Sequence, residues 1–351
     1  MVNWMKEIGS EFWNVPITKK MNQLFPESTQ WFLSGRSALN AIIQELKGCH
    51  TVEIPSWCCD SMIKPFLHVG MEVHFYPVYW KNGLVQEAGL DSDVLFILDY
   101  FGYTDSSLNL NGYKGIIIRD MTHSLFSAKY MDADYYFGSL RKWCGMWTGG
   151  YAWTRDGHRL VEGETDNCGY TSIRENAMRL KQDYIQGIAS VNHYSTAVKG
   201  FLKRFNDAET ILESTGIVSA ADRDVHLAQK LDVEMIVSCR RTNAKILRHA
   251  FPYWLIFPEW KESDCPMFVP IFVPDGQRDK LRNYLVQSEI YCPIHWPVSR
   301  YHKLNERTEI LYKNELSLVC DQRYTKEDMN RIVERINNFW KEVGLCLPFI
   351  H

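Results

Sequence analysis

The sequence lacks a long uninterrupted apolar run, and its first residues lack the apolar core of a signal peptide. A membrane-spanning helix needs about 20 apolar residues in succession, so neither an integral membrane protein nor a secreted one is expected. An excess of basic residues is also lacking, because 39 Lys and Arg stand against 42 Asp and Glu, a net charge of −3. This balance argues against broad binding to nucleic acid or to an anionic membrane.

Closely spaced cysteine pairs of the C-x-x-C type are missing as well, although the chain has ten cysteines. Reduced thiols in the cytoplasm are therefore expected rather than a disulfide framework. Cys58 and Cys59 are adjacent, and neighbouring residues cannot easily take two corners of one tetrahedral zinc site. We predict no metal site.

Apolar residues make up 46% of the 351 residues, enough for a large core and for two domains. Short apolar runs between turn signals, typical of buried parallel strands, alternate with helical segments and predict an α/β fold. Later segments, 172–205 and 222–250, have helical patterns, and Thr325 with Asp328 predicts the start of a final helix. We predict a large domain over 1–240 and a small one over 241–351, with the boundary inside a helix. The strand-like runs are 52–54, 73–78, 94–98, 116–118, 135–137, 151–153, 267–273 and 289–291.

Two groups of residues have the character of an active site, although each alone is more often structural. Gly35-Arg36-Ser37 opens a predicted helix, where free N–H groups attract an anion. Asp120 ends an apolar run, at the strand edge where α/β folds place their sites. For the first the alternative is an ordinary helix cap, and for the second a loop-capping carboxylate.

Lys142 follows another strand-like run and precedes Gly149-Gly150. Flanking Trp143 and Trp147 are expected to desolvate it enough for nucleophilic chemistry, against the alternative of a surface lysine. Ser139 and Lys142 also form a Ser-x-x-Lys motif, but the Ser-Asp-Asn and Lys-Thr-Gly motifs of penicillin-binding proteins are missing.

The order of these features along the chain resembles that of fold-type I pyridoxal-phosphate enzymes, and more narrowly the DegT/DnrJ/EryC1/StrS sugar aminotransferases. The resemblance rests on Ser34–Leu39, Pro55–Trp57, Asp99–Gly102, Arg119–Ser124 and Ser139–Lys142, with weaker matches at Ile290–His295 and Asp321–Tyr324. It implies a large domain with a mainly parallel seven-stranded sheet and a smaller α+β C-terminal domain.

The resemblance also implies a role for each matching residue. Lys142 would form the internal aldimine with pyridoxal 5'-phosphate, and Asp120 would pair with the pyridine nitrogen. His123 would lie near the phenolic oxygen, and either Trp57 or Cys59 would cover the ring. The remaining roles are phosphate binding by Gly35, Arg36, Ser37 and Ser139, and substrate binding by His295, Arg323 and Tyr324.

The implied reaction is transfer of an amino group from an amino-acid donor, with glutamate favoured, to a keto sugar, with a nucleotide-linked sugar favoured. The alternatives are a pyridoxal-phosphate lyase or dehydratase acting on a sugar, and a non-catalytic cofactor-binding protein. Members of this family pair as homodimers in which a Gly-Tyr-Asn-Tyr-Arg segment reaches the partner's phosphate. Gly169–Arg174 is only a loose substitute for that segment.

Overall fold

The protein is described by a computed structural model that covers residues 7–104, 107–127, 132–187 and 194–344. One sheet of seven strands organises the larger part of the chain, in the order β2-β10-β9-β8-β7-β3-β4. The five neighbours from β9 to β4 pair in parallel, whereas β10 runs antiparallel to β9 and β2. The expected mainly parallel seven-stranded sheet is thus confirmed. The strands are β2 (Gln30–Phe32), β3 (Thr51–Pro55), β4 (Glu72–Tyr76), β7 (Val94–Leu98), β8 (Ile116–Asp120), β9 (Tyr135–Ser139) and β10 (Gly150–Thr154).

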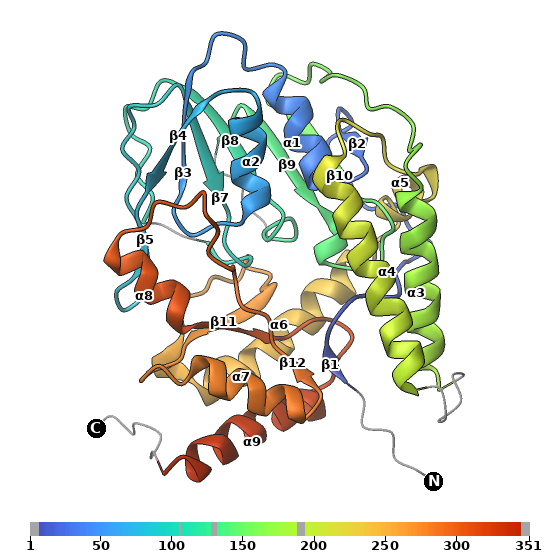
Figure 1. Cartoon of the computed structure of the whole chain (residues 1–351), viewed down its shortest axis with the longest axis vertical. Helices are drawn as coiled ribbons and strands as arrows, with labels where there is room; N and C mark the ends of the chain where they lie inside the picture. The colour runs from blue at the N-terminus through green and yellow to red at the C-terminus, as the bar shows by residue number, and fades with distance from the viewer. Residues whose placement is uncertain (1–6, 105–106, 128–131, 188–193, 345–351) are drawn as a thin grey trace.

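The central strands are short and almost wholly apolar because both faces of the sheet are covered. All five residues of β7 are buried. Helices pack around this sheet, and Figure 1 shows α3 and α4 running side by side along one flank. The helices of this part are α1 (Gly35–Ile43), α2 (Asp60–His68), α3 (Tyr170–Ile185), α4 (Tyr194–Ser214), α5 (Asp222–Ala228) and α6 (Val233–Ala250).

The C-terminal part has a core of its own, formed by residues from Ala244 to Trp340 together with Ile8. The predicted boundary after Arg240 falls inside α6. The N-terminal segment joins this core because β1 (Ile8–Gly9) pairs in parallel with β12 (Ile290–Tyr291). The other elements are β11 (Phe268–Phe272), β13 (Glu315–Val319), α7 (Arg278–Gln287), α8 (Glu306–Asn314), α9 (Lys326–Glu342) and the hairpin of β5 (Val78–Trp80) with β6 (Leu84–Gln86).

The final helix, α9, begins as its sequence predicts. Thr325 is the N-cap, and its backbone N–H donates to Asp328 Oδ2 at 2.8 Å, which completes a capping box. Met329, Ile332 and Ile336 lie on the buried face. Among the described residues, no helix is both long enough and apolar enough to cross a membrane.

Candidate active site

The predicted site residues meet at the carboxyl edge of the parallel strands. Asp120 is the last residue of β8 and Ser139 the last of β9. Parallel neighbours end at the same edge of a sheet, so these two side chains are brought close together. Gly35, the first residue of α1, packs against Ser139, because a Cβ on Gly35 would lie 3.5 Å from the Cβ of Ser139.

These residues line a cavity of about 420 Å³, here called the inner cavity. It brings together most of the residues predicted to bind a cofactor. Those that line it are Gly35, Arg36, Asp120, His123, Ser139 and Lys142, with Cys59.

The start of α1 lines the inner cavity and is suited to bind an anion. Ser34 caps the helix, and its Oγ accepts from the N–H of Ser37 at 3.2 Å. The N–H groups of Gly35 and Arg36 have no acceptor within the helix. The absence of a side chain at Gly150 allows strand β10 to lie directly against the backbone of Ser34, because a Cβ on Gly150 would lie 2.1 Å from Ser34 O. Free N–H groups at a helix start form an anion-binding cradle.

Arg36 and Ser37 differ in their relation to this cradle. Arg36 lines the cavity, and its Nη1 is buried without a hydrogen-bond partner among the described residues. The hydroxyl of Ser37 instead donates to Gly216 O at 2.8 Å, and Ser37 is not among the lining residues. Arg36 therefore faces the inner cavity, whereas the Ser37 hydroxyl bonds within the protein.

Asp120 is a buried carboxylate that also lines the inner cavity. Its side chain is 3% exposed, and its Oδ1 accepts from the N–H of Thr122 at 2.8 Å. Burial raises the pKa of Asp120 to about 7, although the Thr122 hydrogen bond and the charge of Lys142 both lower it. A cationic partner in the cavity would favour the ionised carboxylate.

His123 forms a wall of the inner cavity as a neutral ring. Its ring is stacked on Phe101, with centroids 5.0 Å apart, and on Trp296, with centroids 5.6 Å apart. Burial, with the nearby His295 and Lys142, holds the pKa of His123 well below its usual range. Its Nδ1 is buried and has no hydrogen-bond partner in the part of the chain that the structure describes.

Lys142 ends the short 3₁₀ helix η1 (Leu140–Lys142) that follows β9 directly. Its side chain is exposed to the cavity, so the expectation that flanking tryptophans desolvate it is wrong. Trp143 is fully buried in the core and donates to Thr122 O at 2.7 Å, while Trp147 packs toward α3 and α4. Both rings pack into apolar clusters of the protein, whereas Lys142 is exposed to the cavity.

Of the two residues predicted to cover a ring, Cys59 lines the inner cavity and Trp57 does not. Trp57 is completely buried, stacked on Tyr100 with centroids 4.9 Å apart. Its indole N–H donates to His295 O at 2.5 Å. Trp57 thus joins the strand end of β3 to the C-terminal part of the chain.

A second cavity, of about 530 Å³, adjoins the first and is here called the outer cavity. The two share His123, Arg141, Lys142, Glu209 and Trp296, so Lys142 stands at their junction. His295 and Arg323 also line the outer cavity, whereas Tyr324 does not. The Nδ1 of His295 lies 2.9 Å from the hydroxyl of Ser317, and its ring centroid is 5.8 Å from that of His123.

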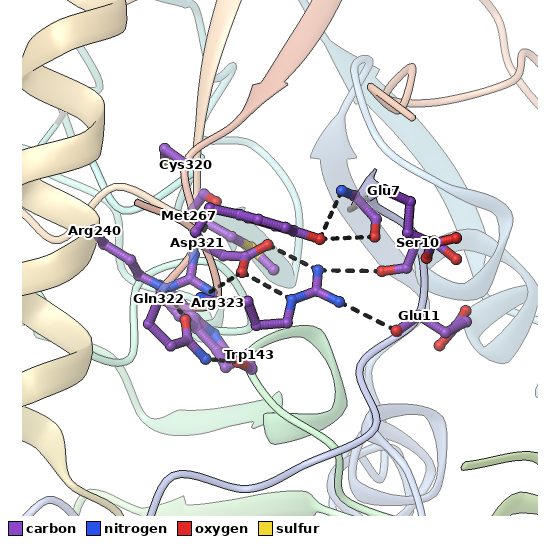
Figure 2. A network of polar contacts seen from close by, with 12 residues as sticks. Glu7, Ser10, Glu11, Trp143, Arg240, Met267, Cys320, Asp321, Gln322 and Arg323 are labelled. Atoms are coloured by element: carbon purple, nitrogen blue, oxygen red, sulfur yellow. Dashed lines mark hydrogen bonds and ion pairs between the residues drawn. The ribbon is translucent and has the colours of Figure 1, made fainter. Parts of the chain in front are cut away.

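Arg323 and Tyr324 bind the N-terminal arm, residues 7–12, as Figure 2 shows for Arg323. Arg323 is ion-paired with Asp321 at 2.8 Å and donates to the carbonyls of Ser10 at 3.2 Å and Glu11 at 3.1 Å. The hydroxyl of Tyr324 donates to Gly9 O at 3.0 Å and accepts from its N–H at 2.8 Å. The predicted substrate residues therefore position the arm that forms one side of the outer cavity.

The sequence analysis gave no role in this chain's own site to three charged residues: Arg141, Arg174 and Glu209. Arg174, on α3, is 2% exposed, and Glu209 comes from α4. The structure places Gly169–Arg174, the loose match to a partner-reaching segment, beside this chain's own Arg141. Nothing local marks Glu209 as part of a site, because it lies 67 residues beyond Lys142.

The titration of Asp120 makes a prediction for the cofactor-free protein. Its folded pKa of about 7 lies above the value of about 3.9 in an unfolded chain, so protonation stabilises the fold. This contribution is complete below about pH 4 and is lost as the pH rises through about 7. Raising the pH from about 5 to about 8 therefore lowers the free energy of unfolding by about 3 kcal/mol. Urea unfolding at both pH values should show a smaller pH dependence in Asp120→Asn; an unchanged dependence would contradict the assignment.

No protein-family model matches the sequence, and no curated protein matches it. Solved structures do match it over most of its length. A DegT DnrJ EryC1 StrS aminotransferase from Brucella abortus is 16% identical with a TM-score of 0.58, covering 89% of this chain and 85% of that one. The putative sugar aminotransferase Spr1654 from Streptococcus pneumoniae, in its PMP-form, is 13% identical with a TM-score of 0.60, covering 94% and 92%.

A third match, Helicobacter pylori PseC, is an aminotransferase involved in the biosynthesis of pseudoaminic acid. It is 14% identical with a TM-score of 0.59, covering 95% of this chain and 100% of that one. The fold is therefore that of fold-type I pyridoxal-phosphate-dependent enzymes. Within that class, the chain has the fold of the DegT/DnrJ/EryC1/StrS aminotransferases, and the resemblance found in the sequence is confirmed at the level of the fold.

Proposed function

We propose that this protein is a pyridoxal-phosphate-dependent aminotransferase that transfers an amino group to a keto sugar. The observation that carries the proposal is the inner cavity, where Lys142 and Asp120 face the same space as the anion cradle of α1. An amine, a buried carboxylate and an anion cradle are the groups that this cofactor requires of a protein.

The residues of the inner cavity fit pyridoxal 5'-phosphate. The N–H groups at the start of α1, the Nη1 of Arg36 and the hydroxyl of Ser139 would hold its phosphate. Asp120 would hold its pyridine nitrogen. His123, whose buried Nδ1 has no hydrogen-bond partner among the described residues, would lie near its phenolic oxygen. The cofactor supplies an electron sink for the carbon that loses or gains the amino group.

Each protein side chain then has a defined task. The charge of a protonated pyridine nitrogen would keep Asp120 ionised, in place of the protonated state that burial favours. Lys142 lines both cavities, where its amine would hold the cofactor and would move a proton at the reacting carbon of the substrate. His123 and Trp296 form the wall between the two cavities.

The outer cavity is the proposed substrate site. Its size and its polar lining, with His295 and several arginines, suit a sugar that carries an anionic group. We propose a nucleotide-linked keto sugar as acceptor and glutamate as donor, in agreement with the sequence analysis. The test is a screen of keto sugars with glutamate, following 2-oxoglutarate release and the near-visible absorbance of the cofactor. Water loss from the sugar without 2-oxoglutarate would point to a dehydratase instead, and no reaction with any sugar would reject the substrate class.

We further propose that the protein works in the cytoplasm as a homodimer. A C2 pairing is the commonest symmetric assembly, and aromatic residues, 13% of this chain, favour interfaces. Light scattering at micromolar concentration with cofactor bound should give about twice the chain mass of 41.1 kDa. A mass equal to that of one chain would contradict the dimer.

A further inference from the structure

Helices α3 and α4 bring three residues to the side of η1, next to Lys142. Arg174 and Tyr170 come from α3, and Glu209 comes from α4. Glu209 forms an ion pair with Arg141, and its Oε1 lies 3.9 Å from Nη1 of Arg174. The Arg141 guanidinium also lies over the ring of Tyr170, 5.6 Å from the centroid. Arg141, Tyr170, Arg174 and Glu209 are here called the Glu209 cluster.

The Glu209 cluster has more buried donors than acceptors. Nε of Arg141, Nε of Arg174 and the hydroxyl of Tyr170 are all buried without a hydrogen-bond partner among the described residues. Arg174 is 2% exposed, and its remaining carboxylate neighbour, Glu11, lies 3.7 Å away. Buried polar groups in folded proteins are normally paired, so the unpaired donors of Arg141 and Arg174, which line the outer cavity, indicate that a ligand completes them. Tyr170 lines neither cavity and lies against the Arg141 guanidinium. Two guanidinium groups with free donors select an anion.

Glu209 itself differs from the arginines in its exposure. Its side chain is 47% exposed and lines both cavities, whereas the Arg141 side chain is 10% exposed. Burial alone would raise the pKa of Glu209, but Arg141, Lys142, Arg174 and Arg36 together lower it to about 2. The two guanidinium groups are therefore largely buried, whereas the ionised carboxylate that they contact belongs to a half-exposed side chain.

We propose that Arg141 and Arg174, with Tyr170 packed against Arg141, form a subsite for the carboxylate of the amino-acid donor, and that Glu209 occupies this subsite until the donor displaces it. The location rests on the proposed function, because the donor's α-carboxylate and its reacting amino group share one carbon. Arg141 precedes Lys142 in the chain and lines both cavities with it. A phosphate is the less favoured occupant, since the cradle of α1 with Arg36 already serves that chemistry in the inner cavity.

Binding of glutarate to the cofactor-free protein tests the subsite without any reaction. Glutarate is a dicarboxylate that has no amino group, and calorimetry measures its affinity directly. Glu209→Gln removes the competing charge and should tighten glutarate binding about tenfold. Arg174→Met should weaken it about tenfold or more, and Tyr170→Phe about threefold.

Matched controls lie on the exposed side of α3. Glu175→Gln and Arg179→Met change the same charges on exposed residues and should leave glutarate affinity unchanged.

Unchanged glutarate affinity in both Glu209→Gln and Arg174→Met would overturn the proposal. So would a Glu209→Gln protein that binds inorganic phosphate more tightly but not glutarate. If Glu209→Gln does not fold, as judged by its thermal transition, Arg174→Met and Tyr170→Phe still decide. Cofactor attachment at Lys142, measured separately on the same proteins, shows whether the proposed function fails independently of this subsite.

Discussion

Lys142→Ala is expected to lower the rate of amino-group transfer by roughly 10⁴-fold, while the protein folds normally. The loss is large because one amine both holds the cofactor and moves the proton. Lys64 also lines the inner cavity, but its amine is ion-paired with Asp60 at 3.1 Å. The side chain is exposed to the cavity, so its removal costs little packing. Single-turnover kinetics with glutamate and the accepted sugar measure the effect.

The control for this variant is Lys114→Ala, which removes an exposed lysine outside the site and should retain full activity. A small primary amine such as methylamine, added to Lys142→Ala, should restore part of the rate because it can reach the open cavity. Activity of Lys142→Ala within about tenfold of the unchanged protein would refute the role of Lys142.

Asp120→Asn is expected to bind the cofactor and yet lose most turnover. A neutral amide keeps the hydrogen bond from Thr122 but cannot stabilise a protonated pyridine nitrogen. Losing a buried charged partner costs about 2–5 kcal/mol, or roughly 30-fold to several thousand-fold in rate. The substitution should lower kcat rather than raise KM, since the interaction strengthens as charge develops on the ring.

Asp91→Asn, on an exposed loop, is the matched control and should leave turnover unchanged. Absorbance titration of the cofactor separates a loss of binding from a loss of chemistry in Asp120→Asn. Near-normal turnover in that variant would show that Asp120 only caps the strand end.

The sheet and its edge were predictable because their signals are local. The runs 94–98, 116–118 and 135–137 form β7, β8 and β9, and Asp120 ends β8 as expected. Strand β13 (Glu315–Val319) was missed, although the alternation of Glu315 and Ser317 with apolar residues is typical of a strand with one face in solvent. The structure buries both, with the hydroxyl of Ser317 donating to Glu315 Oε1 at 2.6 Å and lying 2.9 Å from His295.

The parts of the site that the sequence did not predict depend on contacts between distant segments. Arg174 and Glu209 reach Lys142 only because α3 and α4 pack together, and helical pattern alone does not show which charged residue faces a cavity. The same limit applies to Arg323 and Tyr324. A resemblance gave them a substrate role, but only the tertiary structure reveals that both bind the N-terminal arm.

The exposure of Lys142 has a similar origin. Two neighbouring tryptophans indicate an apolar environment in sequence, yet side-chain direction depends on the backbone. The turn of η1 directs Trp143 into the core and Lys142 into the opening. The position of Trp57 likewise follows from its hydrogen bond to His295 O, which lies 238 residues further along the chain.

The most direct test of the account is the site of cofactor attachment. The purified protein, incubated with pyridoxal 5'-phosphate, should absorb in the near-visible range and lose that band on reduction with borohydride. Peptide mapping should then find a pyridoxyl group on Lys142, and Lys142→Ala should carry none. A pyridoxyl group on another lysine, or on no residue at all, would contradict the assignment of this cavity as the cofactor site.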